Sequence, residues 1–445
     1  MVVSRDKAPT AQETFMQMAQ AAGLRGRLLV TVGLLILARF GVFLPVPGID
    51  RARFSADIQN SPIIGFLDIF SGGGLSALGI FALGILPYIN ASIILQLLTA
   101  AIPSLENLQK NEGEAGRRKI SQITRYVSLG WGVAQSIGIA LWVQKYATTP
   151  GVLFIVETAL ALTAGSMFVM WLSELMTERG IGNGASLLIF VNIVAVLPTT
   201  LGQTIELAQA GGREAVGKVV ILLLVFLVMI VGIVFVQEGT RKIPIVSARR
   251  QVGRRLYRER TSYLPLRLNQ GGVMPIIFAS AVLILPATLA QFAAGNAKGA
   301  LEPVSKALVQ VSNYLSPNGS TPWLYVIVYL VLIVFFSYFY SSLIVNPVDM
   351  SQNLKKMGAS IPGIRPGRTT SEYVERVLNR LTFLGAIFLG LVAVVPTAVE
   401  SATGVTTFRG LGATSLLILV GVAIDTAKQI QTYVISQRYE GMVKQ

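Results

Sequence analysis

The stretch Gly84-Ile-Leu-Pro-Tyr-Ile-Asn-Ala-Ser92 returns half a chain later as Gly272-Val-Met-Pro-Ile-Ile-Phe-Ala-Ser280. When the two stretches are aligned, Gly, Pro, Ile, Ala and Ser coincide. A second pair occurs in the same order, because Ala185-Ser-Leu-Leu-Ile189 recurs as Thr414-Ser-Leu-Leu-Ile418. Two ordered matches predict a duplicated unit, with its junction between residues 193 and 217.

The composition places the chain among membrane proteins. Of its 445 residues, 53% are hydrophobic and only 13% are charged, so the length counts membrane spans rather than soluble domains. The chain has no Cys and no His. This excludes disulfides, thiolate nucleophiles, imidazole metal ligands and a Ser-His-Asp triad. We therefore expect no enzymatic activity, no cofactor and no metal.

Apolar runs of about 20 residues predict membrane-spanning helices. Five candidates precede the junction, at 28–44, 75–101, 121–143, 152–176 and 186–205. Five follow it, at 219–236, 273–292, 324–345, 381–399 and 413–435. The predicted fold is an all-α integral membrane protein with ten transmembrane helices in two halves, 1–205 and 206–445.

Lys and Arg residues predict the orientation of the spans. The chain has a net charge of +15, and most cations fall in connections on one side of the predicted membrane: 5–27, 110–119, 179, 241–267 and 355–380. Both termini should therefore be cytoplasmic. Because each half has an odd number of spans, the second half should be inverted relative to the first.

A short apolar segment at 63–76 is too short to cross the membrane and contains the glycine triplet 72–74. We expect a short re-entrant or interfacial helix. An ordinary exoplasmic loop is the alternative.

Two predicted cytoplasmic connections, 237–270 and 346–380, are long and basic. The first carries eight Lys or Arg between 241 and 260 and an alternating Ile243-Pro-Ile-Val246, which predicts a protruding hairpin. The second contains Pro362-Gly-Ile-Arg-Pro-Gly367, a predicted rigid turn presenting Arg365. Orientation of the spans, attraction to anionic lipid and docking of an anionic partner such as ribosomal RNA could each explain this charge.

The repeat pairs Ile89 with Ile277, and Ile189 with Ile418. Four aliphatic side chains at one depth would form a hydrophobic constriction that excludes ions and water. Ordinary bundle packing is the alternative. Four ionisable residues within predicted spans lie mostly toward the span ends, where contact with the interface is the favoured explanation and a functional role the alternative: Arg39, Glu157, Glu174 and Asp425.

Several longer stretches resemble the SecY family, the channel subunits of bacterial-type Sec protein translocases. They are Phe81-Ala-Leu-Gly-Ile-Leu-Pro-Tyr-Ile89, Gly113-Glu-Ala-Gly-Arg-Arg-Lys-Ile-Ser-Gln122, Thr177-Glu-Arg-Gly-Ile-Gly-Asn-Gly184, Asn353-Leu-Lys-Lys356 and 362–367. The resemblance runs from about residue 28 to the end. It implies ten helices around an hourglass pore, an exoplasmic plug helix, and a lateral gate between the second and seventh spans.

The resemblance also implies roles for individual residues. The pore ring comprises Ile85, Ile89, Ala185, Ile189, Ile277 and Ile418, of which Ala185 is smaller than the aliphatic residue usual there. The plug at about 63–76 includes Ile64, Phe66, Leu67, Ile69 and Phe70. The lateral gate includes Pro87, Asn90, Gln96, Phe278 and Ala281. The partner-docking residues are Arg249, Arg250, Arg254, Arg255 and Arg365.

The implied function is a channel that translocates unfolded polypeptides and releases hydrophobic segments sideways into lipid. The implied partners are the SecE and SecG subunits, the SecA ATPase, the ribosome, and the signal sequences of precursor or nascent chains. The implied location is a bacterial plasma membrane, with the thylakoid membrane as a second location. The competing hypothesis is an inverted-repeat secondary transporter of a small solute, which would need a polar site near the membrane midplane.

Overall fold

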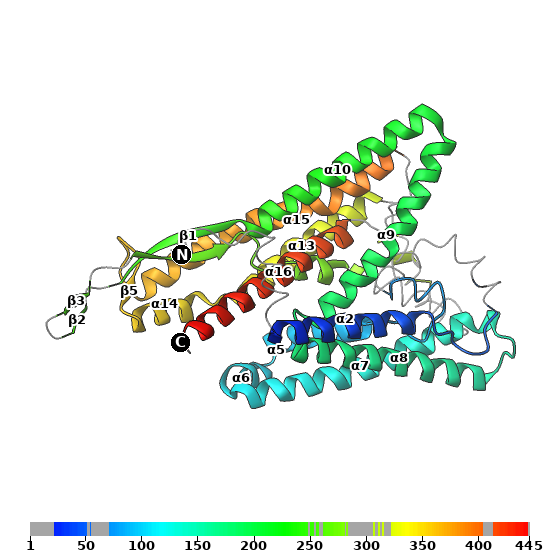
Figure 1. Ribbon diagram of the computed structural model, residues 1–445, viewed down its shortest axis with the longest axis horizontal. Coiled ribbons are helices and arrows are strands. Elements are labelled where there is room, and N and C mark those ends of the chain that lie inside the picture. The colour runs from blue at the N-terminus through cyan, green and yellow to red at the C-terminus, as the bar shows by residue number, and fades with distance from the viewer. Residues whose placement is uncertain are drawn as a thin grey trace. The chain divides into compact units, whose positions relative to one another are not determined.

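The computed structural model of the chain is mostly helical (Figure 1). It describes residues 22–50, 54, 71–247, 250–252, 255–257, 261–280, 282–283, 306–307, 310–311, 314–315, 322–403 and 413–443. The helices of the first half are α2 (Ala22–Val42), α5 (Leu86–Ala101), α6 (Pro103–Asn111), α7 (Gly113–Val143), α8 (Val152–Arg179) and α9 (Gly184–Ala210). Those of the second half are α10 (Gly212–Glu238), α13 (Pro322–Ile344), α14 (Pro347–Lys356), α15 (Arg368–Thr403) and α16 (Ala413–Val443). Residues 274–280 are also helical.

Several of these helices can cross a membrane. Among the described residues, six helices are long and apolar enough, and a seventh span results if α5 and α6, bent by 106° at Ile102, are counted as one. The predicted spans 28–44 and 413–435 lie largely on α2 and α16. The chain is therefore a mostly helical, multi-pass membrane protein, and the count of ten spans stays a prediction.

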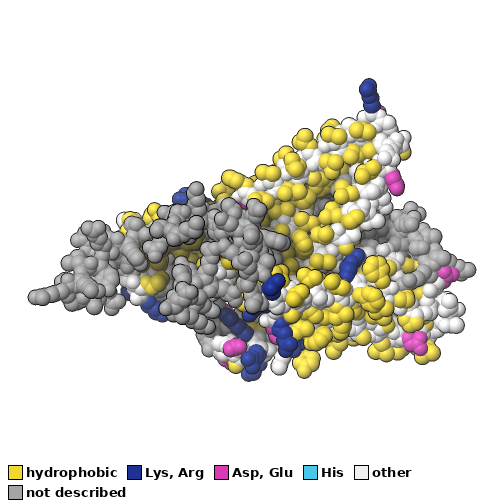
Figure 2. All heavy atoms as spheres, viewed as in Figure 1, with side chains coloured by type: hydrophobic (Ala, Val, Ile, Leu, Met, Phe, Trp, Pro, Cys, Tyr) yellow, Lys and Arg dark blue, Asp and Glu magenta, His cyan; other side chains and the backbone are white. Residues whose placement is uncertain are grey.

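Lipid-facing surfaces are visible on single helices. Leu224, Leu227, Val231 and Phe235 recur along one face of α10 and are all exposed. Figure 2 shows hydrophobic side chains covering much of α10. A continuous exposed apolar face of this size is unusual in a soluble protein and is expected where lipid is the solvent.

The chain divides into two compact units, Met1–Gln203 with Ile418–Gln445, and Thr204–Leu417. The first unit includes most of α16, whose Val434 forms a buried cluster with Leu24 of α2 and Ile181. Arg27 of α2 also lies over the ring of Tyr433, 5.1 Å from its centroid. The two units reflect contacts in space, whereas the predicted halves 1–205 and 206–445 reflect the sequence repeat. The division into two repeated halves stays a prediction.

In the first unit, α7 packs on α5 and α8, and α2 packs on α8. The prediction of a continuous span over 75–101 is wrong in its first part, because residues 72–85 form turns and α5 begins at Leu86. The irregular segment is held against the end of α2: the Ile80 amide donates to the Leu44 carbonyl oxygen at 2.8 Å, and the Val46 amide to that of Leu78 at 3.0 Å. Pro87 therefore starts a helix, where its missing N–H costs nothing, and does not kink one.

The second unit contains a small sheet built from both basic connections. Strand β1 (Thr240–Ser247) pairs antiparallel with β4 (Thr261–Arg267), so the hairpin predicted for 237–270 is confirmed. At its far end, β2 (Arg250–Val252) pairs with β3 (Arg255–Tyr257), and Figure 1 shows this pair beyond β1. The other edge of β1 pairs with β5 (Ala359–Ser360), giving the strand order β4-β1-β5.

The predicted connection 346–380 is largely ordered secondary structure. It contains α14 and β5, and its last part is already helical, because α15 begins at Arg368. This extension of α15 places Val374, Val377 and Leu378 in a buried cluster with Ile243 of β1 and Leu266 of β4. The sheet is therefore anchored on the helix that continues into the predicted ninth span.

Candidate functional site

The two copies of the repeated stretch have the same local backbone. Gly84 and Gly272 occupy equivalent positions and both have positive φ, +53° and +59°. The Ile89 amide donates to the Ile85 carbonyl oxygen at 3.1 Å, and the equivalent Ile277 amide donates to that of Val273 at 3.3 Å. Each stretch thus turns sharply at its glycine and enters a helix with proline in the first turn.

Ile85 and Ile89 lie at the start of α5, one turn apart. Their exposed fractions are 1% and 9%. The turn that positions them is held by α8, because the Ser166 hydroxyl donates to the Gly84 carbonyl oxygen at 3.2 Å. A Cβ at Gly165 would lie 2.2 Å from the Ile80 carbonyl oxygen, so α8 approaches the irregular backbone directly. Side chains in the first turns of α5 are therefore rigidly placed.

Ala185 and Ile189 lie at the start of α9, again one turn apart and on one face. The Asn183 side-chain oxygen caps this helix by accepting from the amides of Ala185, 3.0 Å, and Ser186, 3.3 Å. Ile189 is buried and Ala185 is half-buried. Gly184 lets the start of α9 pack directly on α8, since a Cβ there would lie 2.0 Å from the Ser173 carbonyl oxygen.

Ile418 lies near the start of α16 and is 1% exposed, and Ile277 is 8% exposed. Five of the six predicted ring residues, Ile277 being the exception, belong to the first unit. Ile85 directly precedes α5, and the other five lie in the first two turns of their helices. That the six surround one pore stays a prediction.

The predicted lateral-gate residues have different surroundings. Pro87 is buried in the first turn of α5, and Asn90 is half-buried one turn later. The Gln96 side-chain amide donates to the Ser92 hydroxyl at 3.2 Å. Phe278 is fully buried in the second unit, between Phe336 and Tyr340 of α13, with ring centroids 5.6 Å and 5.1 Å away. Ala281 lies outside the described residues.

Most of the predicted plug, including Ile64, Phe66, Leu67, Ile69 and Phe70, lies outside the described residues. Its last residues are described. Ser71 is buried, and its hydroxyl accepts from the Leu75 amide at 3.0 Å. The Arg39 guanidinium of α2 donates to the Gly72 carbonyl oxygen. Arg39 therefore has a protein partner that the sequence did not reveal, and its position near the interface stays a prediction.

Glu174 is a second span residue with a protein partner that the sequence did not reveal. Its carboxylate pairs with Arg125 of α7 at 2.8 Å. The carboxylate has an exposed fraction of 17%, so this pair links α7 and α8 in a partly buried setting.

Three of the predicted docking arginines lie within the described residues, two on the β2–β3 pair and one in the turn after β5. Arg250 lies on β2 opposite Tyr257, and Arg255 lies on β3 opposite Val252. Arg249 and Arg254 lie outside the described residues. Arg365 is exposed in the turn between β5 and α15, where the Thr370 hydroxyl donates to its carbonyl oxygen at 2.9 Å. Gly363 and Gly367 have positive φ in this turn, which confirms the bend predicted for 362–367.

The sequence did not reveal that both basic connections share one sheet. The pairing of Val246 with Ser360 joins them, and Ile361, directly after β5, is buried in the cluster below the sheet. The alternating apolar residues Ile243 and Ile245 were the available signal, because alternation indicates a strand with one buried face.

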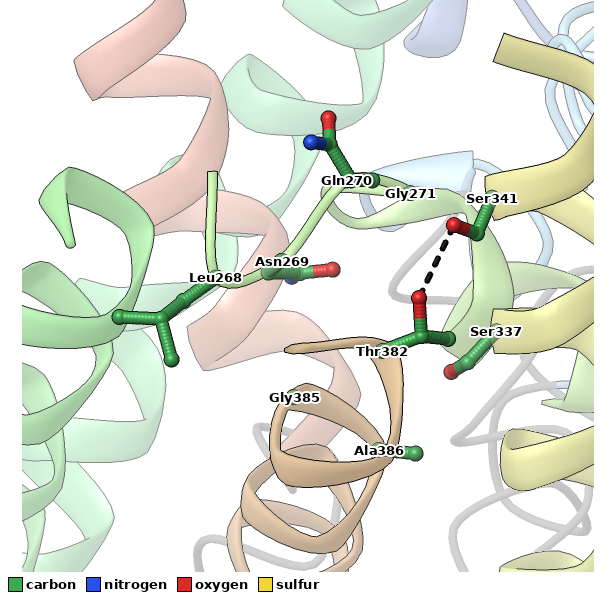
Figure 3. A pocket seen from close by; sticks show the side chains of 9 residues that line it. All are labelled: Leu268, Asn269, Gln270, Gly271, Ser337, Ser341, Thr382, Gly385 and Ala386. Carbon is green, nitrogen blue, oxygen red and sulfur yellow. Dashed lines mark hydrogen bonds between the residues drawn. The ribbon is translucent and has the colours of Figure 1, made fainter. Parts of the chain in front are cut away.

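A pocket in the second unit lies between the end of β4, α13 and α15 (Figure 3). It is lined by Leu268, Asn269, Gln270, Gly271, Ser337, Ser341, Thr382, Gly385 and Ala386. The Thr382 hydroxyl donates to the Ser341 hydroxyl at 2.9 Å, and the buried Ser337 hydroxyl has no protein partner. The cavity volume is about 10 Å³, which is room for one water molecule and far too little for a transported solute.

No group of three Asp or Glu side chains within the described ranges could hold a metal ion. The described residues offer three features that bear on function. They are the buried isoleucines, the irregular segment 72–85 held between α2 and α8, and the basic strands and turns of the two connections.

Comparison with known proteins identifies the relatives of this chain. The family model of SecY matches residues 79–427. The protein translocase subunit SecY of Synechococcus elongatus is 74% identical over 448 aligned positions, covering 100% of both chains. That of Synechocystis sp. is 74% identical over 446 positions, again covering 100% of both. The chloroplastic preprotein translocase subunit SECY of Spinacia oleracea is 43% identical over 419 positions, 94% of this chain and 74% of that one.

Solved structures share the fold. "The structure of a protein conducting channel" matches with a TM-score of 0.64 and 17% identity, over 96% of this chain and 94% of that one. Sec61 in the canine ribosome-channel complex matches with a TM-score of 0.61 and 17% identity over the same shares. At this identity the likeness concerns the fold, which is that of the SecY and Sec61 channels. With its full length covered at 74% identity, the chain belongs to the SecY family.

Proposed function

We propose that this chain is a protein-conducting channel that passes unfolded polypeptides across a membrane and releases hydrophobic segments sideways into lipid. The observation that carries the proposal is the 74% identity, over the whole chain, to subunits named as protein translocase SecY. The fold neighbours described as protein-conducting channels agree with it.

The proposed pore ring is apolar because a moving polypeptide presents every type of side chain. Ile85, Ile89, Ile189, Ile277 and Ile418 are all nearly fully buried, as a constriction between helices requires. Aliphatic side chains exclude water and ions by dewetting and form no hydrogen bonds that would hold the passing chain. Ala185, smaller and half-buried, widens one side of this ring.

The proposed lateral gate lies between α5 and the helix that contains residues 274–280, in an arrangement of ten helices and two inverted halves. A signal sequence entering near Asn90 would shift a closed-to-open equilibrium by its greater affinity for the open state. The plug at 63–76 would close the exoplasmic side of the ring in the absence of substrate.

The basic surface formed by β1, β5, the β2–β3 pair and the 362–367 turn is the proposed docking platform for the SecA ATPase and the ribosome. Arginine clusters suit anionic RNA and acidic protein surfaces. Fold neighbours include channels bound to canine and yeast ribosomes. SecE and SecG are the proposed partner subunits, because membership of the SecY family implies them.

We place both termini and the platform in the cytoplasm, because the Lys and Arg bias of the connections favours that orientation. The proposed location is a bacterial plasma membrane, with the thylakoid membrane as a second location, consistent with a relative named as chloroplastic. No observation favours the secondary-transporter alternative, and the isoleucines of the candidate constriction are apolar and buried.

Site-specific crosslinking tests the channel directly. A photoreactive amino acid at Ile89 or Ile277 should form adducts with a secretory precursor stalled during transport in reconstituted vesicles. The matched control is Leu227, which is 64% exposed on the lipid face of α10 and should form none. Transport without adducts from either isoleucine would show that the polypeptide takes another path.

Charge reversal tests the docking surface. Arg365→Glu should reduce transport driven by SecA or the ribosome, because it places a carboxylate where an anionic partner binds. The control is Arg368→Glu, since Arg368 is equally cationic and exposed but pairs with Glu372 at 2.9 Å within α15. Equal partner binding by both variants and the unmodified channel would contradict the docking proposal.

A further inference from the structure

Arg39 contacts the last residues of the plug segment. Its guanidinium Nη1 donates a hydrogen bond to the Gly72 carbonyl oxygen. The guanidinium carbon also lies 5.6 Å from the centroid of the Phe43 ring, a cation–π distance. Both contacts hold the half-buried Arg39 side chain against protein at the end of α2.

Gly72 fits closely between α2 and α9. A Cβ at this position would lie 2.4 Å from Arg39 Nη1 and 2.5 Å from Asn192 Oδ1. The neighbouring Gly73 differs, because a Cβ there would meet nothing within 4 Å. Both glycines have positive φ, +65° and +89°, so the backbone conformation alone does not distinguish them. The close fit is specific to Gly72.

The contact with α9 lies beside the proposed pore ring. Asn192 follows Ile189 by three residues, and residues at this spacing share a helix face. The face of α9 that carries Ile189 therefore continues directly to the side chain that lies against Gly72. The adjacent Ser71 is buried, so this part of the backbone is enclosed on more than one side.

We propose that Arg39 and Asn192 clamp the backbone at Gly72, and that this clamp positions the end of the plug segment beside the pore ring and stabilises the closed channel. The inference rests on the proposed channel function. Because the acceptor is a backbone carbonyl, the clamp fixes the path of the chain and does not depend on any plug side chain. A hydrogen bond from a cationic donor is about twice as strong as one between neutral groups. Arg39 is thus a positioning residue, and Asn192 limits the space available on the other side.

The test is transport of a precursor with a defective signal sequence, by the channel complex reconstituted in phosphatidylethanolamine and phosphatidylglycerol vesicles. Loss of one hydrogen bond to a charged group should raise the open fraction, and hence this transport, on the order of tenfold. Arg39→Gln and Gly72→Ala should both show the rise. Gly73→Ala is the matched control, since it has the same backbone restriction but open space. Arg125→Gln is a second control that removes a span arginine paired with Glu174.

Each outcome decides the inference. A rise in the two clamp variants, with both controls near the unmodified channel, supports the clamp. The clamp is overturned if Gly72→Ala and Gly73→Ala transport the signal-defective precursor equally well. It is also overturned if Arg39→Gln rejects that precursor as strongly as the unmodified channel does. If Gly72→Ala does not assemble, Asn192→Ala gives the same test, because it removes atoms without adding volume, and an unchanged signal requirement there counts against the clamp. Failure of the unmodified complex to transport an intact precursor would instead overturn the proposed channel function.

Discussion

The turn at Gly84 and the turn at Gly272 have the same backbone but different supports. In the first, the carbonyl oxygen of the glycine accepts from Ser166 of α8, whereas in the second it accepts from the nearby Asn269 side chain, at 2.7 Å. Four residues before each of these glycines, the backbone packs on a glycine of a neighbouring helix: Gly165 against Ile80 and Gly385 against Leu268. The glycine and proline that the two copies share specify the turn. The hydrogen-bond donors that hold it, Ser166 and Asn269, differ between the copies.

The largest difference concerns one equivalent position, Asn90 in the first copy and Phe278 in the second. Phe278→Ala should lower the unfolding free energy by about 3 kcal/mol or more, because it empties a fully buried aromatic site between Phe336 and Tyr340. Asn90→Ala should cost about 1 kcal/mol or less, since Asn90 is only half-buried. Thermal unfolding of the purified complexes in detergent measures both.

The same two variants test whether the predicted gate residue Phe278 mainly packs within its own unit. If it does, Phe278→Ala lowers the unfolding free energy whether or not a signal sequence is bound. Equal, small effects of Phe278→Ala and Asn90→Ala would show that the aromatic cluster does not anchor the second copy.

The sequence predicted those features that repeat or alternate, and missed those that depend on contacts between distant segments. The duplicated stretches, the hairpin at 237–270 and the bend at 362–367 follow from local residue preferences, and the structure confirms the hairpin and the bend. The apolar residues at 75–85 predict helix, and only the close approach of α2 and α8 explains the irregular backbone there. The contact of Arg39 with Gly72 joins residues 33 apart, and no residue pattern encodes it.

Close helix approach is the feature that the two copies share most fully. A Cβ at Gly165 would lie 2.2 Å from the Ile80 carbonyl oxygen, and one at Gly385 would lie 2.8 Å from that of Leu268. Both Ala substitutions should destabilise, by about 2 kcal/mol at Gly165 and about 1 kcal/mol at Gly385, because rigid backbone must move. Gly132→Ala on α7 is the control, since its nearest neighbours would be 3.8 Å away, and it should be neutral or stabilising. A smaller loss at Gly165 than at Gly385 would contradict the ranking.

The smallest expected effects concern the two hydrogen bonds that hold the glycine carbonyl groups. Asn269→Ala removes a 2.7 Å bond to the half-buried Gly272, and Ser166→Ala removes a 3.2 Å bond to the buried Gly84. We expect losses of about 1 kcal/mol, somewhat larger for Asn269→Ala. Hydrogen exchange locates them: Asn269→Ala should speed exchange in peptides covering 272–280 but not 84–92, and Ser166→Ala should do the reverse. The control is Thr432→Val, whose exposed hydroxyl bonds only within its own helix, to the Lys428 carbonyl oxygen. Exchange that rose in both stretches after either substitution would mean that the two turns open together and are not held by separate supports.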